Sequence, residues 1–404
     1  MLLKIIKEGR LDIFFQPIVS IKNKKAFAFE ALLRAYDSNG EILSPAWLFK
    51  QAKKENLSFI LDEAARILAI EKFKPYFDEN PKLLLFLNFE SSSIDRNTDM
   101  REYHFIDKLN ELGIPFKNIV LEVKEDEILN TDALKSFCQY YKSLGFSIAL
   151  DDFGTGNSSF DRLSVIMPTI VKVDRSIIYN VQANYINAEI LKSISNMCKK
   201  IGAMVLAEGA ETHAEVLECM HSGIDIYQGY WFGWPGKDFS ALESIPEKIL
   251  ILVEDFIRER RTIAEIKKGL FEQANSLADK LLEVCTSSEE NNRDELALLV
   301  QNEKNIESVY VIDAQTSRQV GETIMNVTPK CFYEPSIEGE DHSLKEYVYM
   351  TKVSKNASHM TARYISGASG NKCYTFSKKL TLHGRELIFC VDIYGQKQRI
   401  KRCA

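Results

Sequence analysis

The feature that most constrains this chain is a series of eight short apolar runs over residues 11–235, separated by segments with helical periodicity. The predicted strands are Ile13–Val19, Ala26–Leu33, Leu83–Phe89, Ile119–Val123, Ser147–Leu150, Ile170–Val173, Met204–Ala207 and Ile224–Tyr227. The helical patterns between them include Leu57–Phe77, Thr131–Leu144, Ala188–Ile201 and His213–His221. Alternating strands and helices predict a parallel α/β fold. Eight strands in this length favour a TIM-like (β/α)8 barrel over an open sheet.

A polar residue ends or follows most of these runs, and most of these polar residues are acidic. In a barrel, the carboxyl ends of parallel strands open onto one face, where active sites lie. Strands also end in polar residues because loops follow them, but that explanation predicts a mixture of Asn, Ser, Lys and Gly. The bias toward carboxylates favours a functional site made of Glu30, Asn88, Glu122, Asp151, Asp152, Lys172, Glu208 and Gln228.

Composition narrows the class of protein. A length of 404 residues predicts about two domains, and no apolar stretch reaches the roughly 20 residues that span a bilayer. Residues 1–10 mix charges with apolar side chains and lack the core of a signal peptide. No pair among the eight cysteines has zinc-site spacing, and a net charge of −6 argues against a sequence-independent DNA binder. We therefore predict a cytoplasmic protein with no membrane insertion and no DNA partner.

After the alternating region, the pattern changes to one long helix and then to a small α+β domain. Residues 246–284 are predicted to be helical, with a heptad-like apolar stripe of Ile263, Ile266, Leu270, Ala274, Leu277, Leu281 and Val284. Either this helix packs on its own domains, or it is a signalling helix paired across a dimer. The later strands are predicted at Ser308–Ile312, Lys372–Ser377 and Glu386–Ile393, with a hairpin turn at 382–385.

Several motifs, in a fixed order, match a known family. They are Gln16-Pro17-Ile18-Val19, Glu30-Ala31-Leu32-Leu33-Arg34, Asn88, Glu122-Val123-Lys124-Glu125, the run 151–159, Lys172-Val173-Asp174, the run 207–212, and Gln228-Gly229-Tyr230. On these motifs, residues 10–235 resemble the EAL domain family, phosphodiesterases that open cyclic di-GMP. The resemblance implies hydrolysis of cyclic di-GMP to linear 5′-pGpG in bacterial second-messenger signalling. It also implies an EAL domain at 1–245, followed by a linker helix at 246–286 and a regulatory domain at 287–404.

The chemistry of this family explains the residue types. Hydrolysis of a phosphodiester requires charge neutralisation at the phosphoryl oxygens and hydroxide near pH 7, and two divalent ions about 4 Å apart provide both. Hard ions such as Mg²⁺ or Mn²⁺ prefer oxygen ligands, and none of the six histidines lies in a motif. The resemblance implies two such ions in each active site, held by Glu30, Asn88, Glu122, Asp151, Asp152 and Glu208.

The resemblance also implies catalytic and substrate-binding roles. The catalytic set would be Glu30, Asp151, Lys172 and Glu208, with Lys172 orienting the attacking water. Either Glu208 acts as general base through a bound water, or metal-bound hydroxide alone suffices. Lys172 could instead be a structural lysine paired with a carboxylate inside the barrel. Arg34 would contact a substrate phosphate, which suits a guanidinium fork. The remaining substrate-site residues would be Gln16, Leu33, Asp174, Glu211 and Gln228. Glu125 would anchor the loop after the paired aspartates, which in the family couples metal binding to dimerisation.

The C-terminal domain resembles the PAS-like sensory domains that follow some EAL domains, so we expect an unknown small-molecule ligand or signal there. Three positions depart from the family pattern: Lys124 replaces threonine, Ala210 replaces valine and Asn157 replaces tyrosine. A cation at position 124 is expected to alter either the docking of the loop or the local charge at the metal ligands, and so to slow turnover.

Three functions remain open on the sequence. The chain could be an active phosphodiesterase regulated by its C-terminal domain, a degenerate EAL module that binds cyclic di-GMP without cleaving it, or a scaffold that acts through its helix and tail. The first is favoured because every metal-ligand position is filled. From the resemblance and the apolar stripe we also expect a homodimer.

Overall fold

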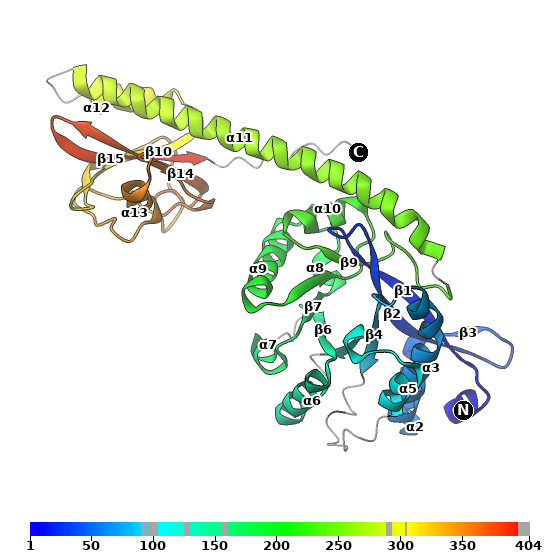
Figure 1. The fold of residues 1–404 in the computed structure, drawn as a ribbon. Helices are drawn as coiled ribbons and strands as arrows, with labels where there is room; N and C mark the ends of the chain where they lie inside the picture. Colours follow the sequence, from blue (N-terminus) through cyan, green and yellow to red (C-terminus); the bar gives the residue numbers. More distant parts are fainter. Residues whose placement is uncertain are drawn as a thin grey trace. The chain divides into compact units, whose positions relative to one another are not determined.

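The structure is a computed structural model, and it describes residues 1–404 except 90–93, 95–103, 125–129, 156–159, 239, 288–292, 304 and 395–404. The polypeptide divides into two compact units, residues 1–258 and residues 259–404. Each unit has its own hydrophobic core, and each is described separately below. Figure 1 shows the elements of both.

A closed barrel of eight strands forms the first unit (Figure 1). Hydrogen bonds join the strands in the order β1-β9-β8-β7-β6-β5-β4-β2, and β2 pairs again with β1 to close the sheet. The short strand β3 (Ile42–Leu43) extends β2 outside the ring. All eight predicted strands are confirmed, as β1 (Leu11–Ser20), β2 (Lys25–Tyr36), β4 (Leu84–Phe89), β5 (Ile119–Lys124), β6 (Ser147–Phe153), β7 (Ile170–Val173), β8 (Met204–Ala207) and β9 (Ile226–Gln228).

One strand departs from the expected parallel arrangement. β1 runs antiparallel to both of its neighbours, β2 and β9, whereas every other neighbouring pair in the ring is parallel. The physical reason lies in the connection between β1 and β2, which consists of residues 21–24 only. A parallel pair needs a crossover of a dozen or more residues, so this short connection imposes a hairpin.

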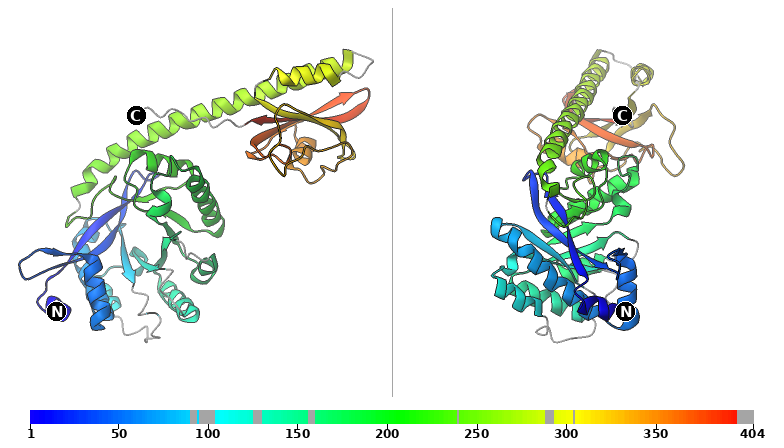
Figure 2. Two further views of the ribbon diagram at one scale, coloured as in Figure 1. Left: turned by 180° about the vertical axis from the view of Figure 1, so that it is seen from behind. Right: turned by 90° about the vertical axis from the view of Figure 1, so that its right-hand side faces the viewer.

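Helices cover the outside of the barrel, and the main core lies between them and the sheet (Figure 2). Helix α6 begins at the Asn130 cap, which accepts from the Ala133 amide, and ends at Gly145, whose φ is 102°. The helices of this unit are α1 (Leu2–Lys7), α2 (Pro45–Glu55), α3 (Ser58–Glu79), α5 (His104–Leu112), α6 (Thr131–Leu144), α7 (Phe160–Ile166), α8 (Arg175–Ile178), α9 (Tyr185–Ile201) and α10 (His213–His221), with 3₁₀ turns at Phe116–Asn118 and Ser240–Ser244.

The side chains that point into the barrel form two layers of opposite character. The first layer is apolar and consists of Ile18, Ala28, Phe86, Val120, Ala149, Ile170, Leu206 and Ile226. Side chains two positions apart lie on the same face of a strand, and the residue two positions further along each parallel strand is polar. In antiparallel β1 the polar residue is two positions earlier. The resulting polar layer is Gln16, Glu30, Asn88, Glu122, Asp151, Lys172, Glu208 and Gln228.

The second unit is a six-stranded antiparallel sheet with helices, which confirms the predicted α+β domain and the three predicted strands. The β14–β15 turn is a two-residue hairpin at His383 and Gly384, with φ values of 48° and 78°, as in a type I′ turn. The elements are α11 (Ile245–Ser287), which begins in the first unit, α12 (Arg293–Gln301), β10 (Ile306–Asp313), β11 (Gln319–Met325), α13 (Glu346–Val353), β12 (Ser358–Met360), β13 (Tyr364–Ile365), β14 (Lys372–Leu382) and β15 (Arg385–Tyr394).

Part of the apolar stripe on α11 packs within this unit. Ala274, Leu277 and Leu281 are buried in one core with residues of β10, β14 and β15, among them Phe376 and Val391. For this part of the stripe, the structure therefore favours the first of the two alternatives, in which the helix packs on its own domain and does not pair across a dimer. Ile263 and Ile266, earlier in the same helix, are half-buried.

A buried carboxylate lies on the opposite face of this sheet. Asp392 alternates with Val391 and Ile393, which belong to the core against α11. Asp392 accepts hydrogen bonds from Ser308 Oγ at 2.9 Å and Thr375 Oγ1 at 2.7 Å. Burial raises the pKa of Asp392 from 3.8 to about 6, against the opposing effect of the two hydroxyl donors.

We expect Asp392→Asn to stabilise the second unit more at pH 8 than at pH 4.5. Because the folded protein holds this proton more tightly than the unfolded chain does, the stability that the carboxyl contributes is complete below about pH 4 and is lost as the pH rises through 6. A difference of about two units between the pKa values of the folded and unfolded states corresponds to about 3 kcal/mol in the free energy of unfolding. Hydrogen exchange of peptides from β14 and β15, corrected for intrinsic rates, measures this effect.

Asp313→Asn is the matched control, and its pH dependence should have the opposite sign. Hydrogen bonds, first from the Thr316 amide, lower the pKa of Asp313 to about 2. Its stabilisation is therefore present above pH 4 and is lost as the pH falls. An Asp392→Asn variant that keeps the wild-type pH profile would contradict the expectation.

Candidate active site

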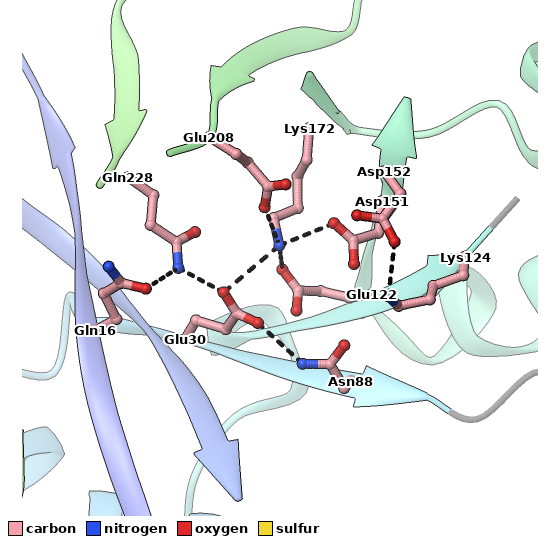
Figure 3. A network of polar contacts seen from close by, with 10 residues as sticks. All are labelled: Gln16, Glu30, Asn88, Glu122, Lys124, Asp151, Asp152, Lys172, Glu208 and Gln228. Atoms are coloured by element: carbon pink, nitrogen blue, oxygen red, sulfur yellow. Dashed lines mark hydrogen bonds and ion pairs between the residues drawn. The ribbon is translucent and has the colours of Figure 1, made fainter. Parts of the chain in front are cut away.

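Lys172 is at the centre of the polar layer (Figure 3). It comes from β7, and its side chain is 1% exposed. Its Nζ lies 2.5 Å from Glu122 Oε1, 2.6 Å from Glu208 Oε1, 3.1 Å from Asp151 Oδ1 and 3.6 Å from Glu30 Oε2. Strands β2, β5 and β6 and the end of β8 thus bring four of the predicted site carboxylates to one ammonium group.

Glu30 is held from two sides by amide side chains. Asn88 Nδ2 donates to Glu30 Oε1 at 3.0 Å, and Gln228 Nε2 donates to Glu30 Oε2 at 2.5 Å. Gln228 also donates to Gln16 Oε1 at 3.0 Å, which is possible because Gln16 lies directly opposite Glu30 in the β1–β2 register. These contacts fix the orientation of the Glu30 carboxylate within the barrel (Figure 3).

The site is rich in strongly perturbed ionisable groups. Burial raises the pKa of Glu122 well above its usual value and that of Glu208 to about 8; nearby carboxylates add to both shifts and Lys172 opposes them. Burial also acts to raise the pKa of Asp151, but the charges of Lys172 and Lys124 outweigh it and the pKa is lowered. Burial acts to lower the pKa of Lys172, yet the carboxylates raise it well above normal. Lys172 is therefore a cation that faces four acidic side chains, more than one ammonium can neutralise without protons or a further cation.

Several oxygens in this layer could accept a further cation. Oε2 of Glu122 is buried without a hydrogen-bond partner among the described residues, whereas Glu122 Oε1 and Asp151 Oδ1 face only the Lys172 ammonium. Unsatisfied buried oxygens of this kind are rare unless an ion or water completes them. Asp151, Asp152 and Glu208 each offer an oxygen within 4.8 Å of the others, which is a suitable set for a divalent ion. The donor set thus fits a hard metal ion.

Asp152 has a second cation as its neighbour. Lys124 Nζ lies 2.6 Å from Asp152 Oδ2, and the two side chains are 44% and 37% exposed. Asp152 has a φ of 56°, in the left-handed region where aspartate is one of the few tolerated residues. The unusual lysine noted in the sequence therefore contacts a predicted metal ligand directly.

A cavity of about 460 Å³ opens beside the carboxylates. Its lining includes Leu33 and Arg34 from β2, both predicted substrate-site residues. The guanidinium of Arg34 packs over the Phe14 ring at 5.2 Å and donates to the Leu33 carbonyl. The lining also includes residues that the sequence did not single out, among them Phe49 and Lys53 on α2 and Arg66 on α3. Phe49 and Lys53 are four positions apart on one helix and so share a face. This spacing is the signal by which the sequence could have indicated them.

The other predicted site residues lie elsewhere. Asp174 caps α8 by accepting from the Ser176 amide at 2.8 Å. Glu211 accepts two bonds from Arg175, at 2.7 and 3.1 Å. Neither residue is among those that line the cavity. Glu125, the predicted loop anchor, lies outside the described residues, as do positions 156–159 of the glycine loop.

Comparison with known proteins defines the class to which this fold and site belong. Residues 1–235 match the family model of the EAL domain. This match covers more than half of the chain, and the chain belongs to the EAL domain family.

Named relatives are similar over this region. The chain is 30% identical over 258 residues to the probable cyclic di-GMP phosphodiesterase PdeG of Escherichia coli K12, covering 62% of this chain and 50% of PdeG. It is 27% identical over 235 residues to the cyclic di-GMP phosphodiesterase PdeA of Borreliella burgdorferi, covering 58% of this chain and 35% of PdeA. The matches thus span between a third and a half of these two relatives.

A solved structure is similar along nearly the whole chain. The YkuI protein of Bacillus subtilis, an EAL-domain protein determined in complex with substrate c-di-GMP and calcium, has a TM-score of 0.83 at 20% identity. The alignment covers 98% of this chain and 99% of YkuI. At this level of identity, the similarity establishes the fold alone. None of the helices that the structure describes is both long and apolar enough to cross a membrane.

Proposed function

We propose that this protein is a metal-dependent phosphodiesterase that hydrolyses cyclic di-GMP to linear 5′-pGpG. The observation that carries the proposal is the polar layer, in which four carboxylates meet beside a cavity around a single ammonium group and Glu122 Oε2 is left buried without a partner among the described residues. Packing alone offers no reason to bury so many acidic groups at one point, because each is costly unless it is paired. The names of the EAL relatives support the same substrate.

Two divalent ions, Mg²⁺ or Mn²⁺, would be held by the oxygens of this layer. We assign Glu30, Asn88, Glu122 and Asp151 to one ion, and Asp151, Asp152 and Glu208 to the other. When bound, such ions supply charge neutralisation at the phosphoryl group and hydroxide near neutral pH. All of these residues are oxygen donors, which is the preference of hard ions.

The chain's own residues would orient the substrate and carry protons. Arg34 lines the cavity and can offer a planar fork to a phosphate. Lys172 stays protonated, so its ammonium can orient the attacking water and stabilise negative charge that develops beside it. Glu208 lies 2.6 Å from the same ammonium, where its carboxylate can accept a proton from that water. Gln16 and Gln228 hold Glu30 in place.

A second candidate function is a cyclic di-GMP receptor that does not hydrolyse its ligand. The observation that favours it is the contact between Lys124 and Asp152, since a lysine on a metal ligand opposes metal binding. Incubation of the pure full chain with cyclic di-GMP and Mg²⁺ or Mn²⁺, followed by chromatography of the nucleotides, separates the two functions. Appearance of 5′-pGpG supports the phosphodiesterase. Bound but intact cyclic di-GMP supports the receptor and refutes the phosphodiesterase.

We also propose that the protein is a homodimer, from the family resemblance and the apolar stripe on α11. Light scattering at micromolar concentration should give about twice the chain mass of 46.2 kDa. Three stripe residues are buried within the second unit, so the dimer contact is expected outside them. A monomeric mass at this concentration would contradict the proposal.

The remaining assignments concern regulation and location. We propose that 1–245 is the catalytic domain, 246–286 a linker helix, and 287–404 a PAS-like domain that regulates hydrolysis through an unknown small-molecule ligand or signal. We place the protein in the cytoplasm, where its substrate would act as a second messenger. Free thiols support a reducing compartment: the described cysteines include no disulfide, and five of the six are buried.

A further inference from the structure

Lys124 is the last residue of β5, and it lies just beyond the polar layer on the same side of the strand as Glu122. The two residues are two positions apart in one strand, so their side chains point the same way. In the β5–β6 register, Lys124 is opposite Asp151, which places its ammonium beside the paired aspartates. The contact of 2.6 Å with Asp152 Oδ2 follows from this placement (Figure 3).

The carboxylate that Lys124 contacts belongs to the candidate cation set. Asp151, Asp152 and Glu208 bring one oxygen each to within 4.8 Å of the others. A divalent ion that takes all three must either share the Asp152 carboxylate with the ammonium or displace the ammonium, and in both cases it has a positive charge close by. Lysine has a flexible four-carbon stem, so its ammonium can move away without a change in β5.

We propose that Lys124 is a built-in monovalent competitor that sets the concentration of divalent metal at which this part of the site fills. Lys124 acts through Asp152 and is a positioning residue. This inference rests on the proposed function, because it concerns the metal ions assigned there. Replacement of the lysine by a neutral residue removes both the competing contact and the repulsion.

The size of the effect follows from the exposure of the pair. At 44% and 37% exposure, water weakens the contact to the range of a surface ion pair, and repulsion between the lysine and the bound ion adds to it. We expect Lys124→Gln to tighten Mn²⁺ binding at the weaker site by about 10-fold. Because the groups are partly exposed, the difference should shrink as the salt concentration rises from about 20 mM to about 500 mM.

The experiment is a Mn²⁺ titration of the metal-free full chain, followed by electron paramagnetic resonance of the free ion, without nucleotide. Lys124→Arg keeps the charge and should bind Mn²⁺ within about 3-fold of the wild type. Lys200→Gln removes an exposed charge on α9 and should change nothing, which controls for net charge. Lys124→Thr is a second neutral variant, and circular dichroism checks that each variant is folded.

The outcomes separate this inference from the proposed function. Tighter binding in Lys124→Gln and Lys124→Thr, with Lys124→Arg and Lys200→Gln unchanged, supports the competitor even if no variant hydrolyses cyclic di-GMP. Equal Mn²⁺ affinity in the wild type and both neutral variants overturns it, as does equal tightening in Lys200→Gln. Absence of Mn²⁺ binding in every variant overturns both the competitor and the proposed metal site.

Discussion

Glu30→Ala is expected to lower the rate of cyclic di-GMP hydrolysis by at least about 1,000-fold while the barrel stays folded. Glu30 is the point where Asn88, Gln228 and Lys172 meet, so its loss removes a proposed metal ligand and releases its neighbours. The apolar layer beneath it is untouched by the change. Product formation measured by chromatography gives the rate, and direct Mn²⁺ titration should show weaker binding.

A matched control is Glu111→Ala, which removes an exposed carboxylate on α5. Both variants should have melting temperatures close to that of the wild type, but only Glu30→Ala should lose activity. Gln228 keeps its contact with Gln16 in the Glu30 variant, which limits the cost of losing one acceptor. Normal turnover in Glu30→Ala would refute the assignment of the active site.

Lys172→Met is expected to destabilise the metal-free barrel by about 3–5 kcal/mol, because it leaves buried carboxylates facing one another without a counter-charge. For a unit of this size, such a loss lowers the melting temperature by about 10 °C. Mn²⁺ should restore much of the stability, since an ion bound only by the folded state stabilises it by about 3 kcal/mol at 100 times its dissociation constant. Activity should stay low even with metal, because the proposed water-orienting ammonium is gone.

Tryptophan fluorescence is a suitable readout for this prediction, because all three tryptophans, Trp47, Trp231 and Trp234, lie in the first unit. The unfolding transition is then that of the barrel. Lys200→Met is the control for loss of a lysine at an exposed position, and it should melt as the wild type does at every metal concentration. Equal stability of metal-free Lys172→Met and wild type would show that the four carboxylates do not depend on this cation.

Much of the fold could be predicted because burial imposes simple periodicities. Each barrel strand is a short apolar run, and α6 and α10 begin and end where predicted because capping residues such as Asn130 and Gly145 mark their limits. The direction of β1 is the exception, because this strand is antiparallel and not parallel as predicted. The residues of β1 suit either direction, and only the four-residue connection to β2 contains the information that it must reverse.

The sequence by itself indicated the residues of the polar layer, because a strand that carries an apolar residue at one inward position and a polar one at the next has a recognisable spacing. Only the tertiary structure decided which of them touch. Closure of the barrel brings Gln16 beside Gln228, residues at opposite ends of the first unit's strand series, and places the Lys172 ammonium among four carboxylates. It also gives Lys124 its partner, Asp152. Such contacts depend on the register of neighbouring strands, which is set by the whole ring and not by any single segment.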